Sequence, residues 1–294
     1  MPEVNFITRT QDDLAASQIN FTRSESNLPF MPLAYLGAKT YANARVAAGR
    51  GDAFEYDAQT ISQAAGIPFF IGSQDMLVVG EYLSRTDFDL KGDALDDFSV
   101  NSAGLPIGWL RQMDIDWQLA AFVMPLYHSS TLENGEDNWQ FMGGVFTRYV
   151  QSEQLWWVFG FYVDNAPSGD LYLPYIGASW EINEQWTVAA MMPWPAISYA
   201  PNENWALRIG ASPSGASWSI DSRGGSVATN LDAWDFGVGV MHHLATGFWL
   251  EFEAGIGGLR GLRLSGSHIE SIETDVGSSA FVGINLSFRP QAQR

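Results

Sequence analysis

The chain of 294 residues contains no cysteine, and this absence removes three kinds of chemistry at once. Without thiols there are no disulfide bonds, no thiolate metal sites and no cysteine nucleophile. Lysine is almost missing as well, because Lys39 and Lys91 are its only occurrences. The folded surface must therefore be covered by something other than the usual mixture of lysine and acidic side chains.

Positive charge is scarce overall. The 15 Lys and Arg residues stand against 33 Asp and Glu residues, which gives a net charge of −18. A phosphate backbone would repel such a chain, and no basic stripe compensates, so the composition excludes nucleic acid as a partner. The chain also lacks the run of about 18 apolar residues that a transmembrane helix needs. Its first residues lack the basic and apolar regions of a secretory signal, so we expect that it is not exported or that a signal was removed.

The chain is rich in alternation with a period of two residues. In 275–288, Ile284 and Leu286 share one parity with other bulky apolar residues, while Gly283 and Asn285 lie on the other. Similar runs occupy 139–150, 171–182, 234–244 and 248–256. They exceed the about 5–6 residues of an ordinary strand and match the about 9–11 residues of a tilted membrane-crossing strand. One face is bulky and apolar and the other carries Gly, Ser and charge, which favours lipid outside and a polar lumen inside.

The connections also alternate, in length. Tight turns at 72–75, 114–116, 152–154, 183–185, 202–204 and 245–247 are separated by longer polar links. Outer-membrane barrels have short periplasmic turns and longer external loops. We therefore predict an all-β fold, a single antiparallel transmembrane β-barrel of the outer-membrane type with 12–14 strands. Residues 1–32 are expected to form an N-terminal extension or plug, 33–290 the barrel, and 291–294 a tail.

One strand needs a break to keep this alternation. Pro193 and Pro195 flank Trp194 between the segments 186–192 and 196–201. Proline cannot donate a ladder hydrogen bond, so two of them are not expected inside a central strand. We predict a short hairpin whose tip, with Trp194 exposed, lies on the side of the long links.

Strand parity assigns the two faces of the wall. The predicted lipid-facing residues are Phe141, Val145, Tyr172, Ile176, Phe236, Val238, Val282, Ile284 and Leu286. The predicted charged residues of the lumen are Glu81, Arg148, Glu181, Arg208, Asp235, Glu251, Glu253 and Asp275. An aromatic girdle at the membrane interfaces is expected from tryptophans near strand ends, with sugar stacking as the alternative. These are Trp117, Trp139, Trp156, Trp157, Trp186, Trp205, Trp234 and Trp249.

Two stretches carry a resemblance. The segment "LPYIGASWEINEQWTVAAMMPWPAISYAPNENWALRIGAS" resembles a broad family of uncharacterised bacterial outer-membrane β-barrels, and no ligand or catalytic residue transfers with it. The alternation of Val282, Ile284, Leu286 and Phe288 resembles the C-terminal assembly signal of outer-membrane proteins, although "RPQAQR" follows where that signal usually ends. The resemblance implies the outer membrane of a Gram-negative bacterium, with outer-membrane lipid and the barrel-assembly machinery as partners.

Catalytic patterns are weak by comparison. Glu251 and Glu253 form an E-x-E pair that a retaining glycosidase could use, but lumen lining explains it more simply. His128 precedes Ser129 and Ser130, yet adjacent strand residues point to opposite faces, so a Ser–His hydrolase is not favoured. The same geometry excludes His242 and His243 as a chelating pair. We expect no enzyme activity, no metal and no cofactor.

The sequence leaves three function classes open. We favour a narrow passive channel or transporter for small, preferably cationic or neutral, solutes. A plugged structural or interaction barrel without conductance is the second class, and a soluble carbohydrate-binding β protein is the third. The sequence determines neither the solute nor the oligomeric state.

Overall fold

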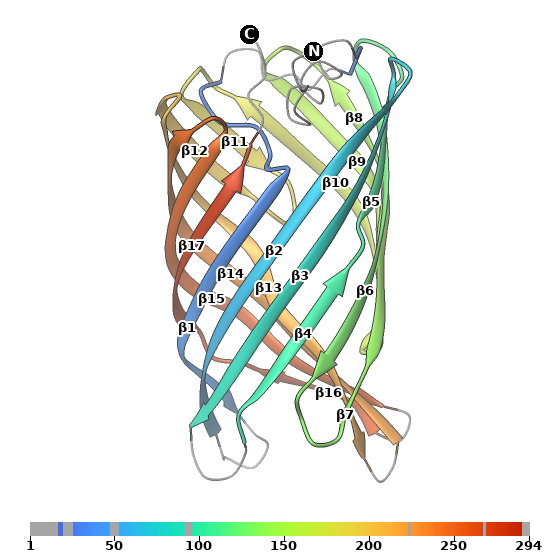
Figure 1. The fold of residues 1–294 in the computed structure, drawn as a ribbon, viewed down its shortest axis with the longest axis vertical. Helices are drawn as coiled ribbons and strands as arrows, with labels where there is room; N and C mark the ends of the chain where they lie inside the picture. The colour runs from blue at the N-terminus through green and yellow to red at the C-terminus, as the bar shows by residue number, and fades with distance from the viewer. Residues whose placement is uncertain are drawn as a thin grey trace, which may run out of the picture.

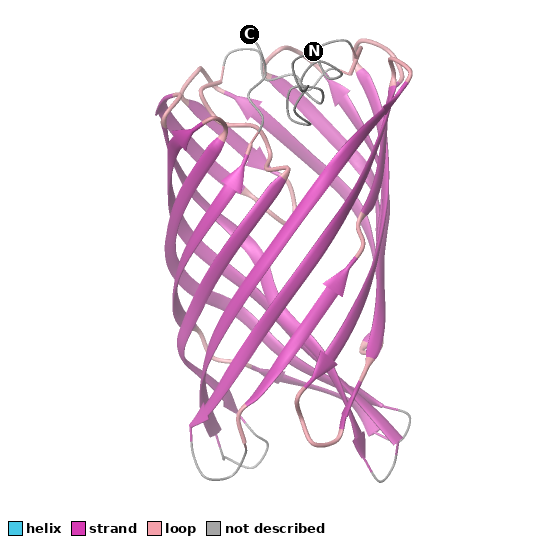
Figure 2. Cartoon of the chain, viewed as in Figure 1, coloured by secondary structure: helices cyan, strands magenta, loops and turns pink. Residues whose placement is uncertain are grey.

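The first and last long strands of the chain pair with each other: Ala34 lies opposite Phe288 and Ala42 opposite Ala280 in an antiparallel ladder. This pairing closes a sheet in which every ladder is antiparallel, as seen in a computed structural model (Figures 1 and 2). The structure describes residues 17–19, 26–47, 53–91, 96–222, 225–266 and 269–289. Within those ranges no helix is long and apolar enough to cross a membrane.

The strands follow one another around the wall in chain order. They are β1 (Ala34–Ala47), β2 (Ala53–Ile71), β3 (Asp75–Lys91), β4 (Phe98–Gly104), β5 (Ile107–Gln112), β6 (Trp117–Ser130), β7 (Gly135–Glu136), β8 (Asn138–Val150), β9 (Leu155–Ala166), β10 (Gly169–Glu181), β11 (Trp186–Ala190), β12 (Ala196–Asn202), β13 (Trp205–Ser222), β14 (Gly225–Ala245), β15 (Phe248–Gly266), β16 (Ile269–Asp275) and β17 (Ser279–Phe288).

These segments make fourteen wall strands in the described part of the chain. β4 and β5 together face both β3 and β6, β16 and β17 together face β15, and β7 is a short bridge within a loop. The break between β4 and β5 falls at Pro106, which has no N–H to donate. Its carbonyl still accepts a 2.8 Å hydrogen bond from the Gly80 N–H. The barrel class and its antiparallel order, predicted from period-two alternation, are therefore confirmed.

The tight turns gather at one end of the barrel. Figure 1 shows the turn between β2 and β3 at this end, and the link between β6 and β8 at the opposite end. Asn183 caps one of these turns, because its Oδ1 accepts hydrogen bonds of 2.9 Å from the N–H groups of Gln185 and Trp186. Asp114 does the same for Asp116 and Trp117 at another turn. Such side-chain-to-backbone bonds are why Asn and Asp favour tight turns.

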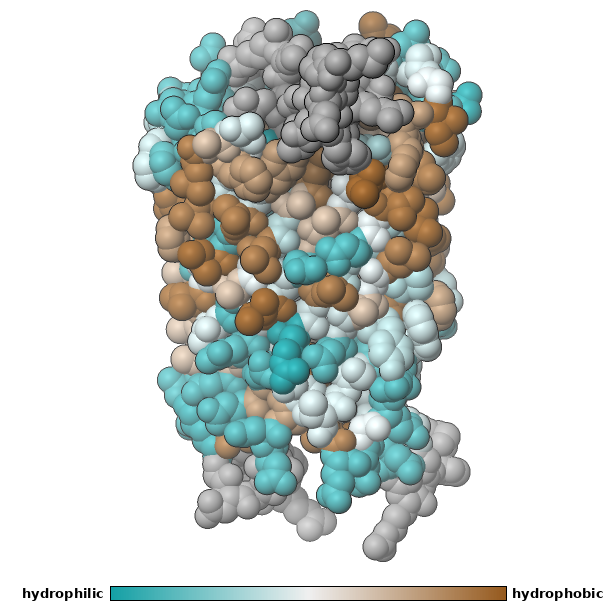
Figure 3. All heavy atoms as spheres, viewed as in Figure 1, coloured by the Kyte–Doolittle hydropathy of each residue, from teal (hydrophilic) through white to brown (hydrophobic). Residues whose placement is uncertain are grey.

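The outer surface is divided into two zones. Figure 3 shows mostly apolar side chains in the half near the tight turns and mostly hydrophilic ones toward the long links. All nine residues predicted to face lipid have large exposed side chains, from 38% for Leu286 to 65% for Ile176. A soluble protein rarely exposes an apolar area of this extent, so the soluble carbohydrate-binding interpretation is not supported.

The proline-flanked segment is a hairpin, but a very short one. β11 pairs with β10 only from Glu181 to Ala178, and β12 pairs with β13 only as far as Gly210. β10 continues to Gly169 and β13 to Ser222, so the tip carrying Trp194 stops partway up the wall. The predicted hairpin is present: its tip is turned toward the long links and Trp194 is 59% exposed, but the tip ends well short of the level of those links. Beyond the tip, the edge of β13 that pairs with β12 has one further described partner. This is β7, which pairs with Ser219 and Ile220.

Apolar side chains inside the barrel form two clusters. The larger one lies toward the long links and includes Tyr41, Tyr56, Phe88 and Phe281, each no more than 7% exposed. The smaller one lies near the tight turns and contains Ala200, Ala206, Met241 and Trp249, against which Leu28 packs. The described interior therefore holds one apolar cluster toward each end of the barrel.

The described part of the N-terminal segment crosses the tight-turn end. Asn27 donates its backbone N–H to the Glu184 carbonyl at 2.7 Å, and its side chain contacts the Ala200 carbonyl at 3.3 Å. Farther along, the Phe30 carbonyl accepts a 2.8 Å hydrogen bond from Arg289. A plugging role for 1–32 stays a prediction, since most of that stretch lies outside the described residues.

Candidate functional site

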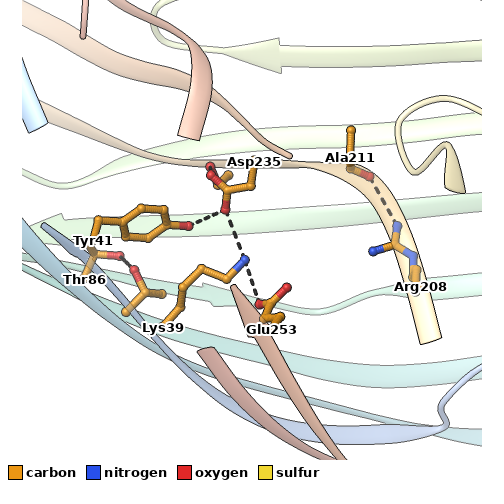
Figure 4. A network of polar contacts seen from close by, with 9 residues as sticks. Lys39, Tyr41, Thr86, Arg208, Ala211, Asp235 and Glu253 are labelled. Carbon is orange, nitrogen blue, oxygen red and sulfur yellow. Dashed lines mark hydrogen bonds and ion pairs between the residues drawn. The ribbon is translucent and has the colours of Figure 1, made fainter. Parts of the chain in front are cut away.

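The polar middle of the lumen is organised around one of the two lysines. The Lys39 ammonium lies 3.1 Å from Asp235 Oδ2 and 2.9 Å from Glu253 Oε1 (Figure 4). Lys39 comes from β1, Asp235 from β14 and Glu253 from β15, so the contacts join β1 to two strands with which it does not pair. We call this set, Lys39, Asp235 and Glu253, the charged layer.

Asp235 is the most deeply buried member, with 1% of its side chain exposed. Tyr41 donates to its Oδ2 at 2.5 Å, and Ser214 donates to its Oδ1 at 2.9 Å. A buried carboxylate is tolerated only when paired and hydrogen-bonded, because desolvation otherwise costs several kcal/mol. Lysine, tyrosine and serine together satisfy that requirement here.

Glycines on neighbouring strands give the glutamates room. Gly239 and Gly283 lie directly opposite Glu253 on its two flanking strands. A Cβ at Gly239 would lie 2.7 Å from Glu251 Oε1, and one at Gly283 would lie 2.9 Å from Glu253 Oε1. The small residues that alternate with bulky ones in the sequence therefore leave space on the inner face, and the glutamate side chains occupy it.

Two arginines lie on the same inner face. Arg208 donates to the Ala211 carbonyl at 3.3 Å, close to the charged layer (Figure 4). Arg148 lies nearer the tight turns, where it donates to Gln118 Oε1 at 3.0 Å and covers the Trp156 ring at 4.8 Å. Glu181, only 4% exposed, also belongs to the inner parity of its strand. Basic and acidic side chains thus both line the inner face of the wall.

Some predicted positions need correction. Glu81 was expected inside, but it shares its parity with Leu83, which is 45% exposed, and its carboxylate hydrogen-bonds to Gln63 at 3.3 Å on the outer face. Apolar and polar residues alternate only weakly along β3, so a polar residue in this strand does not necessarily face the lumen. Trp249 and Trp156, expected in the girdle, point inward; Trp249 is 4% exposed. The Asp275 side chain lies outside the described residues.

Other girdle tryptophans do lie near tight turns with exposed rings. Trp117 packs on Tyr149 and Trp186 on Tyr199, each with ring centroids 4.7 Å apart. Trp205 stacks on His242 at 4.1 Å. These rings stand next to the turns at 114–116, 183–185 and 203–204, as interfacial aromatic residues do in membrane barrels.

Sequence reasoning missed two features. Lys39 lies in the strand whose alternation is weakest, although the rarity of lysine was a signal. His128 does not use Ser129 or Ser130; its Nδ1 lies 2.8 Å from Ser102 Oγ and its Nε2 lies 3.0 Å from Gln140 Oε1. Ser102, His128 and Gln140 thus form a chain of contacts in which the third group is a neutral amide, unlike the carboxylate of a Ser–His–Asp triad. Within the described ranges, no three His, Asp or Glu residues are grouped to hold a metal ion.

Comparison with known sequences assigns the family. Its profile, described as "Domain of unknown function (DUF6268)", matches residues 77–289, from within β3 to just after β17. The chain belongs to the DUF6268 family. The matched region contains Asp235 and Glu253 of the charged layer, whereas Lys39 precedes it. No curated protein matches the sequence.

Solved structures resemble the DUF6268 chain in fold. The COG4313 outer membrane channel from Pseudomonas putida F1 has 12% sequence identity and a TM-score of 0.50, with 92% of this chain and 100% of that chain covered. A deltaS2 mutant of the TodX monoaromatic hydrocarbon channel has 9% identity and a TM-score of 0.48, with 88% and 90% covered. At this level of identity the first likeness shows the fold alone, that of an outer-membrane β-barrel.

Proposed function

We propose that this protein is a narrow passive channel of the outer membrane for small hydrophilic solutes, with a weak preference for cations. The observation that carries the proposal is the charged layer inside a wall whose outer surface is apolar. Ionisable groups enclosed by a membrane-spanning wall are costly, and they commonly mark the path of a solute. The resemblance in fold to an outer membrane channel supports the same function.

The preference for cations follows from the charges beside the path. Glu251 and Glu253 lie on the inner face, and Glu253 is 25% exposed. Lys39 lies between two carboxylates and offsets part of their charge, so the selectivity is smaller than the net charge of the chain suggests. A wall with excess negative charge concentrates cations, and salt screens this effect.

The two apolar clusters restrict the passage. The larger cluster narrows the lumen toward the long links, and Leu28 with its neighbours narrows the other end. Hydrophobic constrictions can gate a pore by excluding water. We therefore expect small and infrequent conductance in the resting protein.

Planar-bilayer recording tests the proposal. Under a KCl gradient, the reversal potential is expected to indicate mild cation preference, stronger at low salt. Glu253→Gln should reduce it and Lys39→Gln should increase it, while Lys91→Gln, at the long-link end, should leave it unchanged. Absence of conductance even after deletion of residues 1–32 would reject the channel. The same result would favour the second candidate, a plugged interaction barrel, which the apolar clusters toward both ends support.

A further inference from the structure

A cavity of about 610 Å³ opens at the long-link end of the barrel, beyond the larger apolar cluster. Its wall comes from β1, β2, β3, β4, β13, β14 and β15, together with the loop that carries β7. The charged layer is not among its lining residues. Pockets that hold small organic molecules have volumes of about 300–1,000 Å³, so this cavity has the size of a ligand site.

The base of the cavity is aromatic. It is lined by Tyr56, Phe88, Phe98 and Trp218, contributed by four different strands. The Phe88 and Phe98 rings stack with centroids 4.8 Å apart, and Trp218 lies 5.7 Å from the first and 5.4 Å from the second. Tyr56 and Phe88 are 3% and 5% exposed, so the base is largely removed from water.

The rim of the cavity is acidic. Asp96, Asp97, Glu133 and Asp221 line it, and all four are exposed. Asp97 is fixed in place, because its Oδ1 accepts a 2.9 Å hydrogen bond from the Leu90 N–H. Among the described lining residues there is no Lys or Arg to neutralise these carboxylates. The field at the mouth therefore attracts cations and repels anions.

We propose that this cavity binds a small amphipathic organic cation with an aromatic or short alkyl body and one ammonium group. The apolar body would occupy the aromatic base, while the ammonium lies near ring faces and rim carboxylates. Ring faces carry negative electrostatic potential and attract cations, most strongly where water is excluded. A sugar would need many hydroxyl partners, which the apolar base does not provide. The site is independent of the proposed channel, because binding here requires no passage through the charged layer.

The probe for the test is benzyltrimethylammonium, titrated calorimetrically into the full chain held in lipid nanodiscs, with empty nanodiscs as the blank. Benzyl alcohol and benzenesulfonate carry the same ring with no charge and with negative charge. We expect the cation to bind about tenfold or more tightly than the alcohol, and the sulfonate not to bind. The affinity should fall as salt is raised.

Variants locate the site. Asp97→Asn combined with Glu133→Gln should weaken binding about tenfold, and Trp218→Leu should weaken it comparably. Glu184→Gln, an exposed acid at the opposite end, is the matched control and should change nothing. Should Trp218→Leu fail to fold, the rim variants alone decide, since their side chains are exposed.

Equal affinity for all three probes would overturn the proposal and leave a merely apolar hollow. Equal losses in the rim variant and in Glu184→Gln would also overturn it, since the attraction would then be a property of the whole acidic surface. If only the channel proposal is wrong, bilayer recordings will show no conductance while benzyltrimethylammonium still binds in calorimetry.

Discussion

The ammonium group of Lys39 on β1 lies 2.9 Å from the carboxylate of Glu253 on β15, although β17 stands between these strands in the wall. The Phe281 ring on β17 lies under the lysine, with its centroid 4.5 Å from Nζ. The lysine stem therefore runs along the inner surface, over an aromatic neighbour, to reach two carboxylates. This arrangement gives one lysine the role of joining β1 to β14 and β15.

Replacement of this lysine should destabilise the barrel. Lys39→Gln leaves the buried Asp235 carboxylate without its cation, and we expect a loss of about 1–3 kcal/mol in the free energy of unfolding. The only other lysine is a matched control: Lys91 pairs with Asp57 at 3.1 Å, with side chains 39% and 35% exposed. Lys91→Gln should cost less than about 1 kcal/mol. Urea titration in lipid vesicles measures both, and equal losses would contradict the assigned role.

Asp235→Asn in the Lys39→Gln background tests whether the two groups act together. If the loss comes from an unpaired charge, the double variant should regain part of it, because neither charge then remains buried alone. A double variant whose losses simply add would show that Lys39 acts through packing.

Arginine substitutions test the two faces of the wall. Ile284 is 44% exposed on the outer surface, whereas its neighbour Asn285 lies opposite Glu251 on the inner face. Ile284→Arg should cost about 2–4 kcal/mol if that position lies at the bilayer midplane, and Asn285→Arg should cost less. Gly239 is a poor inner control, because a Cβ there would meet Glu251. Costs that are equal or reversed in vesicle unfolding would show that the faces are exchanged.

The short hairpin makes a prediction about insertion. A flexible tag between Trp194 and Pro195 is expected to impair assembly or to stay unreachable for antibody on whole cells, because this tip ends partway up the wall. A tag between Glu133 and Asn134, exposed at the long-link end, should assemble and be bound by antibody, since exposed loop tips tolerate insertion. If antibody labelled the tag at Trp194 as strongly as the tag at Glu133, the conclusion that the hairpin tip ends partway up the wall would be wrong.

The N-terminal segment makes a prediction about conductance. Leu28 packs against the cluster of Ala200, Ala206, Met241 and Trp249 at the tight-turn end. Leu28→Ala should loosen this closure and increase the frequency of open events, and deletion of 1–32 should increase it further. Single-channel recording at fixed voltage measures both. Unchanged gating in both variants would mean that the lumen is closed elsewhere, at the larger apolar cluster.

Much of the fold was predictable because strand alternation is a local property. The wall holds fourteen strands, within the predicted 12–14, although two of them are interrupted, one between β4 and β5 and the other between β16 and β17. Long-range geometry was not predictable in the same way. Nothing near Trp194 in the sequence indicates that β10 and β13 outrun the hairpin, since that depends on the register of separate ladders.

The candidate site was only partly predictable for a similar reason. Parity placed Asp235, Glu251 and Glu253 on the inner face, but it could not show that Lys39 reaches two of them over an intervening strand. Parity also misplaced Glu81, because burial barely alternates around it in β3 and polarity alone does not separate inside from outside there. The aromatic cavity was hidden because its rings come from four strands far apart in the sequence.

The length of β14 has a further consequence. Its 21 residues, at about 3.3 Å each and tilted by about 40°, rise roughly 50 Å, about twice the 25 Å apolar band of an outer-membrane barrel. About half of the length of β14 therefore extends beyond the apolar band, toward the end where the aromatic cavity opens. A ligand can therefore enter the aromatic cavity directly from water, without first partitioning into the bilayer. We thus expect membrane-impermeant compounds to reach the proposed site in intact cells.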